Sequence, residues 1–198
     1  MLRIENLYKS FNNEPVFTDY SYNFEKNGIY LLEGPNGVGK TTLLKMIRGI
    51  VTQDSGLITL GCGTPPGECA TYIDANNRSF LHRLTVKENL AYFLALNKQP
   101  KDMTMINSLM EEFQITHLLE KVFSLLSVGQ MQLIALIRGL LEKPKILLID
   151  EALTNIDQQR IENVAGYLER FLDNSNRIVI ICSHTSLPIR ISATVQLR

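Results

Sequence analysis

The sequence predicts an α/β fold with a mainly parallel sheet, an antiparallel β subdomain at the N-terminus and an inserted α-helical subdomain. Two uninterrupted apolar runs, residues 146–149 and 178–182, have the composition of strands buried on both faces of a parallel sheet. Between them, residues 158–172 carry apolar side chains at helical spacing, which predicts a strand–helix–strand crossover. Residues 1–33 instead show short β-type patterns separated by polar turns.

The N-terminal third is expected to hold strands, one helix and their connections. Apolar and polar residues alternate at the start of the chain, and residues 16–24 predict one or two further strands. A helix that follows a glycine-rich turn is expected to end at Gly49, because glycine suits the left-handed position after a helix. Short strands are expected at residues 57–60 and 69–73, and the Gly- and Pro-rich residues 61–67 between them are expected to be loop only.

The pattern changes to helix between residues 74 and 142. Thr85 and Ser127 are each followed three residues later by Glu or Gln, which is the spacing of a capping box at the start of a helix. Another amphipathic helix is indicated by apolar residues at positions i, i+3, i+4 and i+7 from Ile106. The helix after Ser127 is apolar on most sides and should be buried.

Composition bounds the organisation of the chain and its partners. With 198 residues, 45% of them hydrophobic, we expect one domain over residues 1–198. Its α/β core and β subdomain would comprise residues 1–73 and 143–198, and its helical subdomain residues 74–142. Lysine plus arginine equal aspartate plus glutamate at 20 each, and this zero net charge argues against a nucleic-acid partner.

The chain carries no sign of secretion or of a membrane span. Its three cysteines show no C-x-x-C spacing, so free thiols in a reducing compartment are a better reading than a metal site. The N-terminus has no apolar leader, and no apolar run approaches the roughly 18 residues of a membrane span. We therefore expect a soluble chain, or one held at a membrane by a partner.

A phosphate-binding loop is the strongest chemical signal. An apolar run at residues 29–32 precedes it and a helical pattern follows, the context that such a loop requires. The loop residues are Gly34, Pro35, Asn36, Gly37, Val38, Gly39, Lys40, Thr41 and Thr42. The glycines let successive N–H groups point at one anion, and the positive end of the helix dipole adds to them. Lys40 would contact the β- and γ-phosphates and Thr41 would bind Mg²⁺, which predicts a P-loop NTPase core.

Two acids follow the apolar run 146–149. Asp150 and Glu151 stand at the carboxyl end of a buried strand, where an open α/β sheet places its ligand. Asp150 would hold Mg²⁺ directly or through water, and Glu151 would accept a proton from the attacking water. The alternative is that the two acids only end a strand. His184, after the strand 178–182, could reach the γ-phosphate, although a histidine there can also be purely structural.

Taken in order, these residues resemble an ATP-binding-cassette nucleotide-binding domain over essentially the whole chain. The motifs are Phe11 as the base-stacking aromatic residue, Gly34–Thr42 as Walker A, Leu126-Ser127-Val128-Gly129-Gln130 as the signature sequence, Ile146–Glu151 as Walker B, Thr154–Asp157 as the D-loop and His184 as the switch histidine. Taken alone, an aromatic residue such as Phe11 is more often a packed anchor. The compact chain is also similar to the haem-exporter ATPase of bacterial cytochrome c maturation.

The resemblance implies a transport ATPase. ATP and Mg²⁺ would bind between two such domains paired head to tail, as a homodimer or a heterodimer. Walker A of one domain would face Ser127, Gly129 and Gln130 of the other, and Asp157 would act across the same interface. The membrane permease subunits would be separate chains, and the protein would be cytoplasmic and peripheral on the inner membrane. The family docks a permease helix near residues 76–84, where Phe80 and Leu81 are either exposed or packed under the helical subdomain.

Three residues depart from the family pattern. Asn76 stands where the Q-loop glutamine is usual, and its shorter amide would reach Mg²⁺ and the catalytic centre only through an added water. Val128 replaces a glycine of the signature, and its β-branched side chain restricts the backbone. Ala152 replaces a common proline, with little expected effect. The first two departures favour an alternative, a regulatory nucleotide-binding subunit that hardly hydrolyses ATP. A non-transport cassette ATPase is a third alternative, which the charge balance disfavours.

Overall fold

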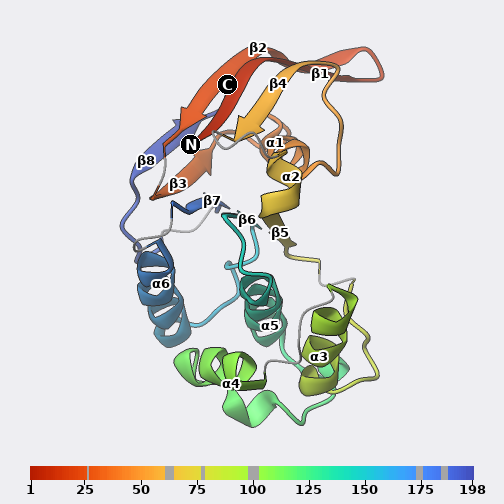
Figure 1. Cartoon of the computed structure of the whole chain (residues 1–198), viewed down its shortest axis with the longest axis vertical. Coiled ribbons are helices and arrows are strands. Elements are labelled where there is room, and N and C mark those ends of the chain that lie inside the picture. The colour runs from red at the N-terminus through yellow and green to blue at the C-terminus, as the bar shows by residue number, and fades with distance from the viewer. Residues whose placement is uncertain (26, 61–64, 77–78, 98–102, 173–175, 184–186) are drawn as a thin grey trace.

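A computed structural model describes residues 1–25, 27–60, 65–76, 79–97, 103–172, 176–183 and 187–198. Two β-sheets and a group of helices make up the molecule, with the antiparallel sheet at one end and helices α3 and α4 at the other (Figure 1). This arrangement confirms the predicted α/β class with its antiparallel and helical parts. The division of the chain at residues 73 and 143 stays a prediction.

The larger sheet, sheet B, is parallel in all its pairings and has the strand order β5-β6-β7-β3-β8. Its strands are β3 (Gly28–Glu33), β5 (Ala70–Asp74), β6 (Ile146–Asp150), β7 (Ile178–Cys182) and β8 (Ala193–Gln196). Every residue of β6 and β7 is buried, as their apolar runs predict. The parallel order matters for function because the carboxyl ends of β3, β7 and β6 meet at one edge.

The smaller sheet, sheet A, is antiparallel with the order β2-β1-β4. Its strands are β1 (Leu2–Phe11), β2 (Glu14–Phe24) and β4 (Ser55–Leu60). Residues 16–24, predicted as one or two strands, belong to the single strand β2, and only the turn Asn12–Asn13 separates β2 from β1. Both asparagines adopt positive φ, 51° and 65°, which this residue type tolerates better than most others.

The helices begin and end largely where local chemistry predicts. They are α1 (Lys40–Arg48), α2 (Pro66–Cys69), α3 (Val86–Leu96), α4 (Met103–Glu112), α5 (Val128–Leu141) and α6 (Gln158–Leu172), with short 3-10 turns at Thr116–Leu118 and Phe123–Leu125. Capping boxes are present at Thr85 and Ser127, and Gly49 adopts the left-handed conformation after α1. The prediction that residues 61–67 are only loop is wrong at Pro66 and Gly67, which lie in α2. Residues 61–64 lie outside the described residues.

Sheet B separates two hydrophobic cores because its strands alternate between its faces. One core contains Ile149 and Ile181 and is covered by residues of α3, α4, α5 and α6. The other contains Leu148 and Ile180 together with the apolar face of α1 and the inner face of sheet A. Helix α5 has nine buried residues, which confirms the prediction that it is buried. Helix α1 therefore lies on the same side of sheet B as sheet A.

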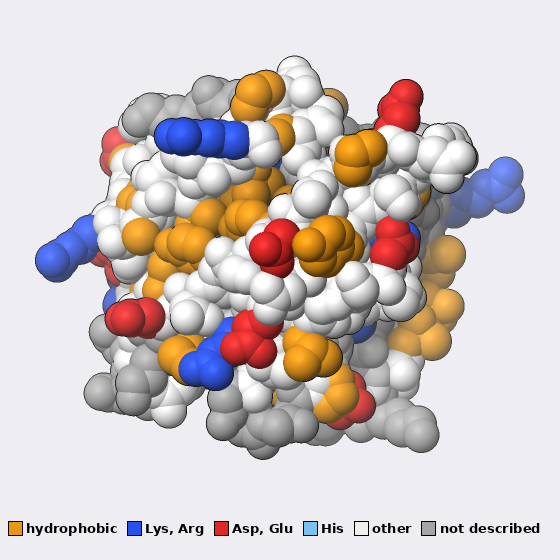
Figure 2. Space-filling view, turned by 90° about the horizontal axis from the view of Figure 1, so that it is seen from above, with side chains coloured by type: hydrophobic (Ala, Val, Ile, Leu, Met, Phe, Trp, Pro, Cys, Tyr) orange, Lys and Arg blue, Asp and Glu red, His pale blue; other side chains and the backbone are white. Residues whose placement is uncertain are grey.

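The surface at the sheet A end is mixed in character. Seen from above in Figure 2, basic and acidic side chains are interspersed among polar and apolar groups. Among the described residues, Leu57 and Ile50 are the most exposed large hydrophobic side chains of this part of the chain, each at 58%.

No helix in the described ranges is both long and apolar enough to span a bilayer. Cys69 and Cys182 are free thiols, as predicted, and Cys62 lies outside the described residues.

Candidate functional site

The loop between β3 and α1 has the backbone geometry that its glycines predict. Gly37 and Gly39 adopt φ of 83° and 109°, in the region that L-residues rarely occupy. Gly39 is also required sterically, because a Cβ there would lie 2.6 Å from Val16 Cγ1 and 2.9 Å from Phe17 Cζ. Strand β2 of sheet A therefore packs directly against the loop, and its contact depends on the absence of a side chain at this position.

Lys40 is the first residue of α1 and is 9% exposed. Its Nζ donates hydrogen bonds to the carbonyl oxygens of Gly34 at 2.6 Å and Pro35 at 3.0 Å, so the ammonium lies within the loop. A hollow of about 280 Å³ adjoins it and is lined by Leu32, Glu33, Gly34, Lys40, Ser183 and Gln196. The outer loop residues Pro35, Asn36, Gly37 and Thr41 are exposed and open to a ligand.

Asp150 and Glu151 lie at the carboxyl end of β6, which only β7 separates from β3, the strand that leads into the phosphate loop. Asp150 ends β6 and is 7% exposed, on the face covered by α1 together with Leu148. Glu151 has φ of 55°, an uncommon conformation for a residue with a side chain, and its amide donates to the Cys182 carbonyl oxygen at 3.0 Å. The Thr154 hydroxyl donates to the Glu151 carbonyl oxygen at 3.1 Å. These contacts hold the chain in the turn that follows Asp150.

Two residues of the neighbouring strands flank the Asp150 carboxylate. The Tyr72 hydroxyl on β5 donates to Oδ2 at 2.7 Å, and Cys182 on β7 is the register partner of Asp150. Burial, followed by the hydrogen bond to Asp150, raises the pKa of Tyr72 well above its ordinary value. Burial and the negative charge of Asp150 likewise raise the pKa of Cys182. Both groups therefore stay protonated at neutral pH and are available as donors.

This constellation suits a magnesium–nucleotide ligand. The Asp150 carboxylate and the Thr41 hydroxyl supply hard oxygen donors, which Mg²⁺ prefers. They lie on the same face of sheet B, because α1 begins at Lys40 and covers the face that carries Asp150. Among the described residues, no cluster of three or more His, Cys, Asp or Glu side chains is placed to hold a metal by protein ligands alone. A site that also uses phosphate oxygens and water fits this arrangement.

Ser127 caps α5 within its own chain. Its Oγ accepts the Gln130 amide at 3.3 Å, and its amide donates to Gln130 Oε1 at 3.1 Å. Ser127 is nevertheless exposed, and Val128 beside it is 55% exposed. The N-terminal end of a fourteen-residue helix thus faces outward, with the favourable field that a helix N-terminus offers to an anion.

The D-loop packs against the start of α5. A Cβ on Gly129 would lie 2.1 Å from the Asn155 carbonyl oxygen, so only glycine allows this approach. The Asn155 amide donates to Oε1 of the fully buried Gln132 at 3.0 Å. Gln132 was not predicted as a site residue, because a single glutamine in an apolar helix gives no local signal. The signature and the D-loop are therefore joined within one chain.

Asp157 stands at the start of α6. The Arg160 amide donates to its Oδ1 at 3.2 Å, and the Arg160 guanidinium lies 2.6 Å from Oδ2. Partial burial raises the pKa of Asp157, but the hydrogen bonds from Arg160 outweigh it and hold the pKa below its ordinary value. Asp157 therefore has a helix-capping role, and the exposed carboxylate is also accessible from outside.

Three further predicted residues lie in different settings. Phe11 is 45% exposed at the end of β1, with Lys9 Nζ 4.9 Å from its ring centroid, so it is not a buried anchor. Asn76 is exposed, and its amide donates to Asp74 Oδ1 at 3.2 Å. His184 lies outside the described residues. Asp74, the register partner of Asp150 on β5, also reaches this edge of the sheet and was not predicted.

Phe80 and Leu81, each expected to be either exposed or packed, differ in their burial. Phe80 is 3% exposed and stacks on Phe123 with ring centroids 4.3 Å apart, so for this residue the packed alternative is correct. The guanidinium carbon of Arg138 lies over the Phe80 ring, 5.1 Å from its centroid. Leu81 is 40% exposed and remains available to a partner.

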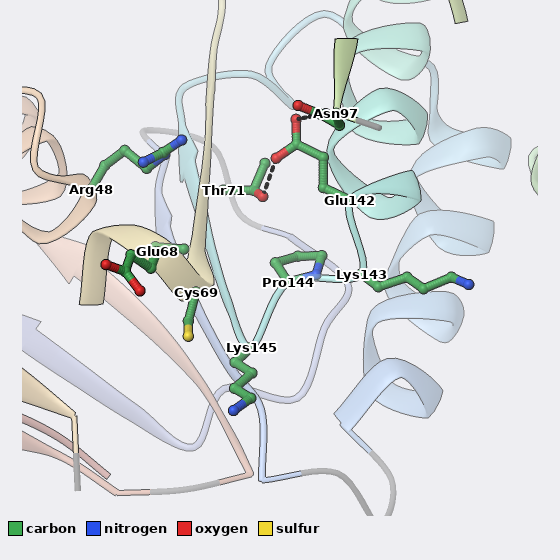
Figure 3. A pocket seen from close by; sticks show the side chains of 10 residues that line it. Arg48, Glu68, Cys69, Thr71, Asn97, Glu142, Lys143, Pro144 and Lys145 are labelled. Carbon is green, nitrogen blue, oxygen red and sulfur yellow. Dashed lines mark hydrogen bonds between the residues drawn. The ribbon is translucent and has the colours of Figure 1, made fainter. Parts of the chain in front are cut away.

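A second hollow, of about 400 Å³, lies at the opposite edge of sheet B (Figure 3). It is bordered by the start of β5 and by residues 142–145, which precede β6. Inside it, the Thr71 hydroxyl donates to Glu142 Oε2 at 2.6 Å, and Arg48 Nη1 donates to the Gly67 carbonyl oxygen at 2.7 Å. Because the strands are parallel, this hollow is remote from the carboxyl ends that carry Asp150 and the phosphate loop.

Comparison with known proteins gives concordant matches. The family model for "ABC transporter" matches residues 17–154. The sulfate/thiosulfate import ATP-binding protein CysA of Thermosynechococcus vestitus is 32% identical over 194 residues, which cover 92% of this chain and 56% of CysA. The lipopolysaccharide export ATP-binding protein LptB of Haemophilus influenzae is 32% identical over 202 residues, covering 93% of this chain and 80% of LptB. This chain thus spans little more than half the length of CysA.

Solved structures agree with the fold. A Pyrococcus furiosus ATP-binding protein ascribed to an ABC transporter superposes with a TM-score of 0.84 and 25% identity, covering 99% of this chain and 96% of that one. The cbiO1 protein of Clostridium perfringens, part of the complex cbiONQ, superposes with a TM-score of 0.77 at 22% identity and 93% and 78% coverage.

Proposed function

This chain belongs to the ABC transporter family, and we propose that it is the ATP-binding and ATP-hydrolysing subunit of a membrane transporter. One observation carries the proposal. In sheet B only β7 separates β3, which leads into the phosphate loop, from β6, which ends in Asp150 and Glu151. The loop and the two acids therefore share one edge of the sheet, where an α/β sheet binds its ligand. Relatives named as import and export ATP-binding proteins support the same function.

Each residue of the proposed site has a separate role in ATP binding or hydrolysis. The backbone N–H groups of the loop from Gly34 to Thr42, which Pro35 lacks, and the ammonium of Lys40 bind the phosphates of ATP. Thr41 and Asp150 would hold Mg²⁺, and Asn76 would reach it through water; the bound ion would offset charge on the phosphate oxygens. Glu151 accepts the proton of the attacking water, and His184 orients the γ-phosphate.

We propose that two such domains pair head to tail, as a homodimer or a heterodimer, and that ATP drives this pairing. The exposed N-terminus of α5 supports this, because Ser127 and Val128 face outward and can meet a nucleotide on a second domain. Gly129 and Gln130 complete that surface, and Asp157 contacts the partner. Phe11, exposed at the tip of sheet A, stacks on the adenine base.

The transporter's other subunits are proposed to be membrane permease chains. The exposed Leu81 offers them an apolar contact, and the protein would sit on the cytoplasmic face of the inner membrane. CysA is named for sulfate/thiosulfate import and LptB for lipopolysaccharide export at equal identity to this chain, so cargo and direction vary among its relatives. The similarity to haem-exporter ATPases stays a prediction, and co-purification of the permease from membranes tests it.

The test is ATP turnover by the wild type and the Glu151→Gln variant. Loss of the general base should lower turnover at saturating Mg-ATP by at least 10²-fold. Glu162→Gln, an exposed residue of α6, is the matched control and should turn over like the wild type. With hydrolysis blocked, Glu151→Gln should dimerise on adding ATP, as measured by light scattering.

Two results would overturn the proposal. A wild type that binds no Mg-ATP would remove the function altogether. A wild type no faster than Glu151→Gln would replace it with the regulatory nucleotide-binding subunit that Asn76 and Val128 favour.

A further inference from the structure

The Tyr72 side chain makes a contact that its packing does not require. Its ring belongs to the hydrophobic core between sheet B and α1, a role that phenylalanine would fill equally well. The hydroxyl, however, donates to Asp150 Oδ2 at 2.7 Å, a short, charge-assisted hydrogen bond. In the strand register Tyr72 faces Leu148, so the side chain reaches two residues further along β6 to meet the carboxylate.

The Asp150 carboxylate is buried between two neighbouring strands. Tyr72 donates to it from β5, and on the other side Cys182 of β7 is its register partner. Because Asp150 is only 7% exposed, its carboxylate has few positions open to it besides the one that the Tyr72 hydroxyl contacts. A carboxylate offers about four acceptor positions on two oxygens, and Tyr72 uses one of them on Oδ2. Acceptor positions therefore remain for a ligand on the side of the phosphate loop.

We propose that Tyr72 is a positioning residue, whose hydroxyl orients the Asp150 carboxylate for Mg²⁺ bound with the nucleotide. The inference deepens the proposed function and rests on it. The physical basis is general: hydrogen bonds to a metal-binding carboxylate orient it before the metal arrives, and their loss typically lowers metal affinity or activity 10–100-fold. Here the donor comes from β5, the strand that pairs with β6, so the register of sheet B sets the position of the hydroxyl relative to Asp150.

The test compares Tyr72→Phe with Tyr30→Phe. Each variant keeps the ring and removes one hydroxyl from the same core, but Tyr30 donates to the Glu25 carbonyl oxygen at 3.1 Å, away from the acids. Binding of a fluorescent ATP analogue is titrated with Mg²⁺, and separately measured in excess EDTA. Tyr72→Phe should raise the half-saturating Mg²⁺ concentration about tenfold and leave affinity in EDTA within about twofold of the wild type. Tyr30→Phe should leave both unchanged.

The outcomes separate this inference from the proposed function. If the wild type shows Mg²⁺-dependent nucleotide binding and Tyr72→Phe matches it, the positioning role is wrong and the proposed function stands. A lower half-saturating Mg²⁺ concentration in Tyr72→Phe would also overturn it, because the hydroxyl would then compete with the ion. A general packing defect would weaken binding in EDTA as well. If Tyr72→Phe does not fold, Tyr72→Leu, which also lacks the donor, is titrated in its place with the same expected shift.

Discussion

Gly129 of the signature sequence packs against the backbone of Asn155 in the D-loop. It is the second residue of α5, and an added Cβ would lie 2.1 Å from the Asn155 carbonyl oxygen and 3.0 Å from the Asn155 carbonyl carbon. Both of these atoms belong to the backbone, so no side-chain rotation can relieve the overlap. In Gly129→Ala the D-loop must move away from α5 by roughly 1 Å to restore an ordinary contact.

The cost can be worked from these contacts. Overpacking a well-packed site costs about 1–3 kcal/mol, and the shift would also weaken the hydrogen bond from the Asn155 amide to Gln132, worth about 1 kcal/mol. Alanine gains about 0.5–1 kcal/mol over glycine inside a helix, which offsets part of this loss. We expect a net destabilisation of about 2 kcal/mol. For a chain of this length that corresponds to a Tm lower by roughly 4–8 °C.

Thermal unfolding without nucleotide measures this effect. Gly166→Ala in α6 is the matched control, because a Cβ there meets only the Arg170 Nη1 atom at 3.4 Å. It should raise the Tm by about 2 °C through helix propensity alone. If nucleotide-free Gly129→Ala unfolds at the wild-type temperature, the steric argument is refuted, and the glycine would be needed only for contact with nucleotide.

Two further predictions concern the start of α3. Asn89 is fully buried: its Oδ1 accepts the Leu81 amide, and its Nδ2 donates to the carbonyl oxygens of Leu81, Leu84 and Thr85. Asn89→Ala should therefore lower the free energy of unfolding, measured in urea, by about 2–4 kcal/mol. A loss under about 1 kcal/mol would contradict this. Hydrogen bonds from the Thr85 amide and hydroxyl lower the pKa of Glu88, so its stabilising effect is complete at neutral pH and is lost as the pH falls through that lowered pKa. The Tm difference between wild type and Glu88→Gln should therefore shrink as the pH falls below the ordinary glutamate pKa of about 4.3, and an equal difference at pH 7 and at about pH 2 would refute the argument.

The elements that the sequence predicts well are those governed by neighbouring residues. Each capping box pairs two side chains three positions apart, so Thr85 and Ser127 mark their helices locally. The apolar runs of β6 and β7 are those of strands buried on both faces, which implies a covered parallel sheet. The phosphate loop is equally local, since its glycines and Lys40 are contiguous.

The elements that it misses depend on distant partners. Strand β8 has one buried residue, Val195, and exists because it pairs with β3 over 160 residues away in the sequence. The four-residue helix α2 begins with Pro66, whose fixed φ suits a first turn as well as a loop. The Tyr72–Asp150 hydrogen bond depends on the register of β5 with β6, which no local pattern reveals.

The same distinction explains the organisation of the proposed nucleotide site. The phosphate loop and the signature can each be recognised separately, but the signature must also be positioned relative to the acids of its own chain. That position is set by two contacts of Asn155, with Gly129 and with Gln132. Asn155 lies four residues after Glu151 in the same turn, so a shift at the start of α5 would be felt at Glu151. Replacing Gly129 should therefore disturb both halves of the site, including the half that its own helix does not form.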